Sequence, residues 1–186
     1  MDEAARRARD EWLALRCQLG EPAAFEELVA EFERPLLYYS AKLLGDENQA
    51  FDVVQEVWLR ALRQIRRLKQ ANAVRAWLYR MAHGISVDRL RQERSRRRVE
   101  EIKSEALDEA AESPEFGAED VAAVHRALDQ LELAHREVIV LQFLEDMSIA
   151  EIASVLDCPP GTVKSRLHYA KRALREALDR GGYGNE

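Results

Sequence analysis

The amino-acid sequence predicts an all-α protein with two small helical domains, an N-terminal helical bundle and a C-terminal four-helix domain, joined by a flexible acidic linker. Only 8 of the 186 residues are glycine and 5 are proline, and Ala, Leu, Arg and Glu dominate, which favours helices. Apolar residues recur at steps of three and four through most of the chain. This periodicity fades once, in an acidic stretch that contains the helix breakers Ser113-Pro114 and Phe116-Gly117.

The first segment predicts two helices. One covers residues 3–19 and ends at Gly20. The second begins at Pro22, a favourable first-turn residue, and ends at Gly45. Pro35 lies inside it and should bend it, because proline cannot donate the helical hydrogen bond. The apolar stripe of the second helix consists of Phe25, Leu28, Val29, Phe32, Leu36, Tyr39 and Leu43.

Two further helices complete the N-terminal bundle. Asp46 followed by Gln49 is a cap-and-return pair that predicts the start of a third helix. A short loop at residues 69–73 precedes a fourth helix from Val74, which becomes strongly basic over residues 89–98. The two apolar stripes, which can join one core, are Ala50, Val54, Val57, Ala61 and Ile65 in the third helix and Trp77, Leu78, Met81, Ala82 and Ile85 in the fourth.

The charge distribution divides the chain in a similar way. The net charge is −6, yet residues 60–103 hold 14 Lys and Arg against 4 Asp and Glu. Residues 158–180 hold 6 against 2, whereas residues 104–157 hold 2 against 14. Since nucleic-acid binding depends on the local field rather than on the sum, two basic blocks indicate two surfaces that face nucleic acid.

We place the domain boundaries around the acidic stretch. The predicted order is an N-terminal domain at 1–98, a flexible acidic linker at 99–120, a C-terminal domain at 121–180 and a disordered tail at 181–186. The C-terminal domain is expected to contain four helices and no strand, and these helices cover 121–131, 134–144, 148–156 and 160–180.

The last two helices have the spacing of a helix-turn-helix. Ser148 and Glu151 form a capping box that starts the first helix, and residues 157–160 end it and start the second. Val163, Leu167, Ala170 and Leu174 mark the buried side of the second helix. The opposite side and its edges present Thr162, Lys164, Ser165, Arg166, His168, Tyr169, Lys171, Arg172 and Arg175.

Polar and basic side chains at the start of such a helix can reach base edges in the major groove, and the flanking cations can hold phosphates. A merely solvated helix face is the alternative. The capping box, the proline turn and the lack of acidic residues over 162–175 disfavour it.

Several classes of protein and site are disfavoured. The sequence has no phosphate loop, metal-ligand cluster or nucleophile motif, and its four histidines are scattered. We therefore expect no enzyme, no cofactor, no metal and no small-molecule substrate. Cys17 and Cys158 are expected to be ordinary buried or half-buried thiols. The N-terminus lacks the apolar core of a secretion signal and no stretch is long enough to span a membrane, which predicts a cytoplasmic protein.

Two blocks of the sequence resemble a known family. DVVQEVWLRALR (52–63) with RAWLYRMAHGISVDRLR (75–91), and SIAEIASVLDCPPGTVKSRLHYAKRAL (148–174), are similar to the second and fourth conserved regions of bacterial sigma-70 family sigma factors of the extracytoplasmic-function (ECF) type. The resemblance implies a chain that joins core RNA polymerase, directs it to promoters and helps to melt them. It also implies contacts with the clamp helices of the largest subunit and with the flap, and an anti-sigma factor as a further partner.

The resemblance also implies three sets of site residues. Those facing the polymerase are Asp52, Gln55, Glu56 and Trp58. Those facing the −10 element are Leu68, Lys69, Asn72, Trp77, Arg80, Gly84, Asp88 and Arg91. At the −35 element, Lys164, Ser165, His168 and Tyr169 match base-reading positions, and Thr162, Arg166, Lys171 and Arg172 match backbone-contacting positions.

The chain departs from the family pattern at two of the −10 positions. Gly84 stands where asparagine is common, and Leu68 stands where an aromatic residue is common. Trp77 has a second interpretation, because its place in the apolar stripe also suits a core residue.

Two other functions are compatible with parts of the sequence. A polymerase-independent helix-turn-helix regulator would explain the C-terminal domain but not the block at 52–91. A purely structural helical adaptor would explain the apolar stripes but not the basic recognition face.

Overall fold

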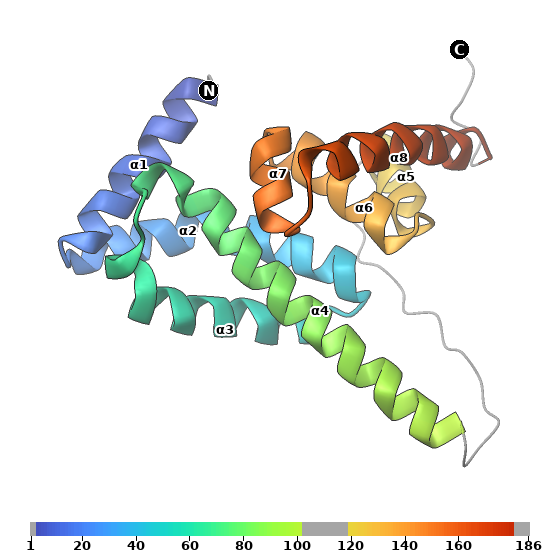
Figure 1. Cartoon of the computed structure of the whole chain (residues 1–186), viewed down its shortest axis with the longest axis horizontal. Coiled ribbons are helices and arrows are strands. Elements are labelled where there is room, and N and C mark those ends of the chain that lie inside the picture. Colours follow the sequence, from blue (N-terminus) through green and yellow to red (C-terminus); the bar gives the residue numbers. More distant parts are fainter. Residues whose placement is uncertain (1–2, 102–118, 181–186) are drawn as a thin grey trace.

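The structure, a computed structural model, describes residues 3–101 and 119–180, and within these ranges it contains helices and no strand. The predicted all-α class is confirmed. Figure 1 shows two groups of helices, with α4 running diagonally beneath the second group. The N-terminal group comprises α1 (Glu3–Gln18), α2 (Pro22–Leu44), α3 (Glu47–Gln64), the 3₁₀ turns η1 (Ile65–Arg67) and η2 (Ala71–Ala73), and α4 (Val74–Glu101). The C-terminal group comprises α5 (Glu119–Asp129), α6 (Leu133–Ile139), the π turn η3 (Val140–Leu144), α7 (Ile149–Val155) and α8 (Pro160–Arg180).

Local signals define most of the helix ends. Gly45 takes a left-handed φ of 70° after α2, and its N–H donates to the Ala41 carbonyl at 2.8 Å. Asp46 caps α3 by accepting from the Gln49 N–H at 3.0 Å. The Gln49 side-chain amide returns to the Asp46 carboxylate at 3.5 Å and donates more closely, at 2.5 Å, to the Glu93 carboxylate on α4.

Three predicted boundaries need correction. The loop expected at 69–73 contains the 3₁₀ turn η2. The helix expected at 134–144 is α-helical only to Ile139 and then widens into η3, where the Glu145 N–H reaches the Val140 carbonyl five residues back. The linker expected at 99–120 is helical at both ends, since α4 continues to Glu101 and α5 begins at Glu119. The rest of that predicted linker, and the predicted tail at 181–186, lie outside the described residues.

The N-terminal core follows the predicted apolar stripes. Leu28, Phe32, Leu36 and Tyr39 of α2 are fully buried. Tyr39 meets Tyr79 of α4 edge-on, with ring centroids 5.3 Å apart. Each such large apolar side chain contributes about 1.5–3 kcal/mol through burial, so α2 is the central support on which α3 and α4 pack.

The two groups pack against each other. Buried residues of both groups form one continuous cluster, which runs from Leu13 in α1 to Ala170 in α8. The helical periodicity predicted which side of each helix is buried, but not that the C-terminal group rests on α2 and α4. No described helix is long and apolar enough to cross a membrane.

Candidate nucleic-acid and polymerase interfaces

The capping box positions the helix-turn-helix. The Ser148 N–H donates to the Glu151 carboxylate at 2.8 Å, and the Glu151 N–H donates to the Ser148 hydroxyl at 3.3 Å. After α7, Asp157 takes a positive φ of 48°, and Pro160 opens α8 in its first turn. These features confirm the predicted start of α7 and the turn that aims α8.

Helix α8 presents the predicted face to solvent. Val163, Leu167 and Ala170 are buried on its inner side. On the outer side, six of the predicted residues are exposed and two, Thr162 and Arg166, are half-buried. The exposed six are Lys164, Ser165, His168, Tyr169, Lys171 and Arg172. The structure therefore brings all eight predicted residues onto one helix, over about three turns.

Polar contacts orient several of these side chains. The Arg166 guanidinium donates to the Glu137 carboxylate of α6 at 3.0 Å. Burial raises the pKa of the Glu137 carboxyl to about 7, while the nearby Arg166 charge opposes that rise. The Lys171 ammonium lies 5.2 Å from the centre of the exposed Phe143 ring, and the rings of His168 and Tyr169 meet edge-on at 5.4 Å.

A second line of predicted residues follows α4. Trp77, Arg80, Gly84, Asp88 and Arg91 recur at steps of three and four, so they share one helix face. The last four are exposed, whereas Trp77 is half-buried and packs against the core. The remaining three predicted −10 residues lie in the preceding turn, where Lys69 and Asn72 are exposed and Leu68 is half-buried.

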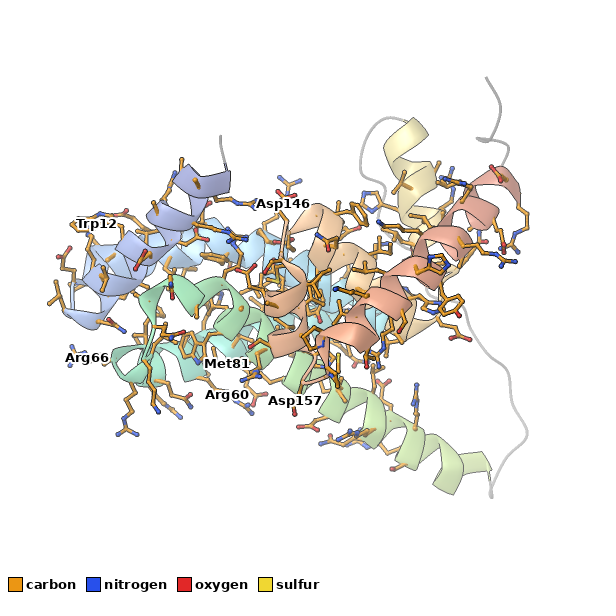
Figure 2. The ribbon with its side chains drawn as sticks, turned by 45° about the horizontal axis from the view of Figure 1, so that its top comes forward. Trp12, Arg60, Arg66, Met81, Asp146 and Asp157 are labelled. Atoms are coloured by element: carbon orange, nitrogen blue, oxygen red, sulfur yellow. The ribbon has the colours of Figure 1, made fainter. Side chains whose placement is uncertain are left out.

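A polar hollow of about 560 Å³ lies between α3 and α4. Its lining includes Glu56, Arg60, Asp88, Arg89 and Arg96. Arg60 of this lining is labelled on the lower side of the N-terminal group in Figure 2. The hollow thus joins a residue predicted to face the polymerase, Glu56, to one predicted to face DNA, Asp88.

The predicted polymerase-facing residues lie along α3. Asp52 and Gln55 are exposed, and the Asp52 carboxylate pairs with Arg89 of α4 at 3.2 Å. Glu56 is half-buried and pairs with Arg60. Trp58 is also half-buried, with its ring meeting Phe25 edge-on at 6.0 Å.

Phe51, Leu59 and Leu62 of α3 were not among the predicted site residues. Their side chains are 52%, 57% and 60% exposed. Phe51 lines an apolar hollow of about 280 Å³ between α2 and α3, together with Leu37, Gln55 and Trp58. The sequence held part of this signal, because these three apolar residues fall outside the predicted apolar stripe. Val53 also falls outside that stripe but is fully buried, so the stripe alone did not identify the exposed residues.

Comparison with known proteins decides the family. The Sigma-70 region 2 family matches residues 28–96, and the Sigma-70 region 4 family matches residues 122–174. The ECF RNA polymerase sigma factor SigL of Mycobacterium tuberculosis is 39% identical over 160 residues, which cover 85% of this chain and 90% of SigL. The chain belongs to the ECF sigma factors. Its function is therefore that of a sigma factor, which directs RNA polymerase to promoter DNA.

This sigma factor is similar to others in sequence and structure. The RNA polymerase sigma-H factor of Pseudomonas aeruginosa is 30% identical over 181 residues, covering 91% of this chain and 94% of that protein. The structure of CnrH in complex with the cytosolic domain of CnrY matches with a TM-score of 0.68 and 27% identity, covering 92% and 98% of the two chains. The sigma factor RpoE in complex with the anti-sigma factor NepR from Bartonella quintana has the same fold, with a TM-score of 0.70 at 23% identity over 83% and 96%.

Proposed function

We propose that this sigma factor reads the −35 element with α8 and the −10 element with α4 and the turn before it. The observation that carries the proposal is the exposed cationic face of α8, which is held outward by the buried Val163, Leu167 and Ala170. A recognition helix whose outer face is polar and basic fits the major groove of duplex DNA.

Within α8, the exposed Lys164, Ser165, His168 and Tyr169 are the base-reading residues of the proposal. Thr162, Arg166, Lys171 and Arg172 contact the DNA backbone. Arg166 already pairs with Glu137, so its guanidinium is pre-oriented but partly neutralised. Arg172 also pairs with a carboxylate, that of Glu176 at 2.8 Å, but both of these side chains are exposed to solvent. We therefore expect Lys171 and Arg172 to contribute more to phosphate binding than the half-buried Arg166 does.

The proposed −10 surface combines cations with one aromatic edge. Lys69, Arg80 and Arg91 are exposed cations that attract the backbone of an unpaired strand, and the half-buried Trp77 offers part of its ring for stacking. Gly84 leaves open space on the same face, since an added Cβ there would meet no atom within 4 Å. That space suits a base that lies close to the helix backbone.

The proposed polymerase interface is α3. Asp52, Gln55 and Glu56 supply polar and anionic groups to the clamp helices of the largest subunit, and Trp58 with the exposed Phe51 supplies an apolar hollow beside them. The C-terminal group meets the flap of the polymerase. The polymerase itself carries out RNA synthesis. The chain acts with it in the cytoplasm as a non-enzymatic subunit, and it needs no cofactor.

An anti-sigma factor is the third proposed partner. Support comes from the similar sigma factor RpoE, whose structure was solved with the anti-sigma factor NepR. Two residues of α3 that meet the polymerase in our proposal, Asp52 and Gln55, are exposed and so are available for such an inhibitor to cover.

Run-off transcription with purified core RNA polymerase tests the proposal. We expect defined transcripts only when the chain is added, and loss of those transcripts with Asp52→Lys/Gln55→Lys, which reverses the character of the α3 face. Glu11→Lys, an exposed change on α1, is the matched control and should leave transcription unchanged. A palindromic footprint by the chain alone, without transcripts in the presence of polymerase, would favour the polymerase-independent regulator instead.

A further inference from the structure

A cluster of exposed cations lies at the end of α3 and in the turn that leads toward α4. We call these four residues the basic patch, and they are Arg63, Arg66, Arg67 and Lys69. None of the four pairs with a carboxylate among residues 3–101 and 119–180. The neighbouring Arg60, in contrast, pairs with Glu56 on its own helix. The basic patch therefore carries four positive charges that the described part of the chain does not neutralise.

Helix α1 holds the backbone of the basic patch in place. The Gln18 side-chain amide donates to the Leu68 carbonyl at 2.7 Å and to the Ile65 carbonyl at 3.4 Å, so it spans the turn η1. Gly20, which follows α1, has a φ of 86°, and a Cβ added there would lie 2.7 Å from a guanidinium nitrogen of Arg66. The missing side chain at Gly20 thus leaves room for the Arg66 head group. The cations of the patch project from a turn that α1 supports.

The basic patch continues the proposed −10 surface. Lys69 belongs to both, and Asn72 and Arg80 follow it along the turn and α4. In Figure 2, Arg66 lies at the edge of the N-terminal group that points away from the C-terminal group. The chain passes from the end of α4 to the C-terminal group, which meets the upstream −35 element in our proposal. The end of α4 therefore faces upstream DNA, and the turn before α4, with the basic patch, faces downstream DNA.

Phosphate groups match the basic patch better than base edges do. Guanidinium and ammonium groups bind phosphate oxygens strongly, and such contacts need no particular base. Residues 63–70 contain no aromatic side chain on which a base could stack. An unpaired strand that leaves the −10 surface in the downstream direction meets these cations next.

We propose that the basic patch binds the sugar–phosphate backbone of the unpaired strand just downstream of the −10 element, without reading its bases. This proposal rests on the proposed assignment of α4 and the turn before it to the −10 element. A strand that is held by its phosphates is less free to pair again, so the patch favours the melted state of the promoter. The contribution is electrostatic, and it therefore weakens as the salt concentration rises.

Binding of the holoenzyme to two forked probes tests this proposal. Both probes derive from a promoter that gives transcripts in the run-off assay, and their nontemplate strand is unpaired from the −10 element onward. The short probe ends with that element, and the long probe extends about ten nucleotides farther downstream. Wild-type holoenzyme should bind the long probe more tightly than the short one. Arg66→Gln/Arg67→Gln should lose part of this gain while it binds the short probe as the wild type does.

Salt dependence gives the size of the effect. Each contact with a phosphate of a single strand contributes about 0.7 to the slope of log affinity against log salt concentration, so two lost contacts reduce the slope by about 1.4. Between about 50 and 200 mM salt, binding of the wild type to the long probe should therefore weaken about sevenfold more than binding of the double variant. The same salt dependence for both proteins overturns the proposal.

Controls separate this role from other roles of the same cations. Arg126→Gln/Arg180→Gln removes two exposed arginines from α5 and α8, and this matched control should bind both probes as the wild type does. An equal loss by the patch variant on both probes, or a loss that depends on the bases of the extension, overturns the proposal. Weaker assembly of the patch variant with core polymerase in the absence of DNA assigns the patch to an acidic protein surface instead. Circular dichroism verifies that each variant remains helical.

Run-off transcription distinguishes a failure of this proposal from a failure of the proposed function. An absence of transcripts with the wild-type chain contradicts the proposed function. Transcripts together with an unchanged salt dependence in Arg66→Gln/Arg67→Gln contradict the role of the basic patch alone.

Discussion

Glu137 offers a direct test of the balance between burial and ion pairing beside α8. Its side chain is only 7% exposed, and its carboxylate accepts from Arg166 at 3.0 Å. Burial raises the pKa of the carboxyl from 4.5 to about 7, because the charged form loses its hydration. Glu137→Gln keeps the shape and the acceptor oxygen but removes the charge, so it imitates the protonated carboxyl at every pH.

The raised pKa fixes the sign and size of the effect. Between about pH 4.5 and pH 7 the folded chain retains a proton that the unfolded chain has lost, so the contribution of Glu137 to stability falls as the pH rises. A tenfold change in proton affinity corresponds to about 1.4 kcal/mol, and the full difference therefore corresponds to about 3 kcal/mol. We expect Glu137→Gln to be more stable than the wild type by about 3 kcal/mol at pH 8 and equal to it near pH 4.5.

Urea unfolding monitored by circular dichroism from pH 4.5 to pH 8.5 measures this difference. The comparison of variant and wild type at each pH is essential, because burial lowers the pKa of His83 beside it, which makes stability fall as the pH drops below 6.5. Glu11→Gln, an exposed carboxyl on α1, is the control and should change stability by less than about 0.5 kcal/mol at any pH. If Glu137→Gln is less stable than the wild type at pH 8, the Arg166 ion pair outweighs burial and our reasoning is refuted.

Three further predictions concern the helix-turn-helix and two glycines. Ser148→Ala removes the cap of α7 and should cost about 1 kcal/mol, seen as a fall of about 2–4 °C in Tm, whereas Ser165→Ala on α8 should leave Tm unchanged. Gly84→Ala should stabilise the protein by up to about 1 kcal/mol, because the added Cβ on α4 meets open space. Gly45→Ala should destabilise the protein by about 1 kcal/mol, because the φ of 70° at this position disfavours a side chain. Equal shifts of the two variants in urea unfolding would contradict both assignments. Lys164→Ala should weaken binding of the polymerase holoenzyme to the preferred −35 sequence by about 1–3 kcal/mol, and an equal loss on scrambled −35 DNA would assign Lys164 to phosphate contact instead.

Much of this fold could be predicted from local features of the sequence, because capping and periodicity act within a few residues. Gly45 predicted the end of α2, and Ser148 with Glu151 predicted the start of α7. The buried side of α8 followed from the spacing of Val163, Leu167 and Ala170, and this also predicted which residues face outward. Gln49 shows the limit of such rules, since its side-chain amide lies 3.5 Å from the local Asp46 carboxylate but 2.5 Å from the carboxylate of Glu93, which is 44 residues away in sequence.

The relation between the two groups of helices could not be read from the sequence. Periodicity shows that a helix has a buried side but does not identify the helix that covers it, so α7 resting on α4 has no signature of its own. The burial of Lys42 and the low exposure of the Arg75 side chain, 11%, are a stronger case, because charged residues are predicted to be exposed until their partners are known. Asp129 and Glu145, which neutralise them, come from the opposite end of the chain and reach them only when the groups pack together. Local chemistry thus accounts for the helices and for which of their sides face outward, whereas long-range burial and ion pairing determine how the two groups of helices pack together.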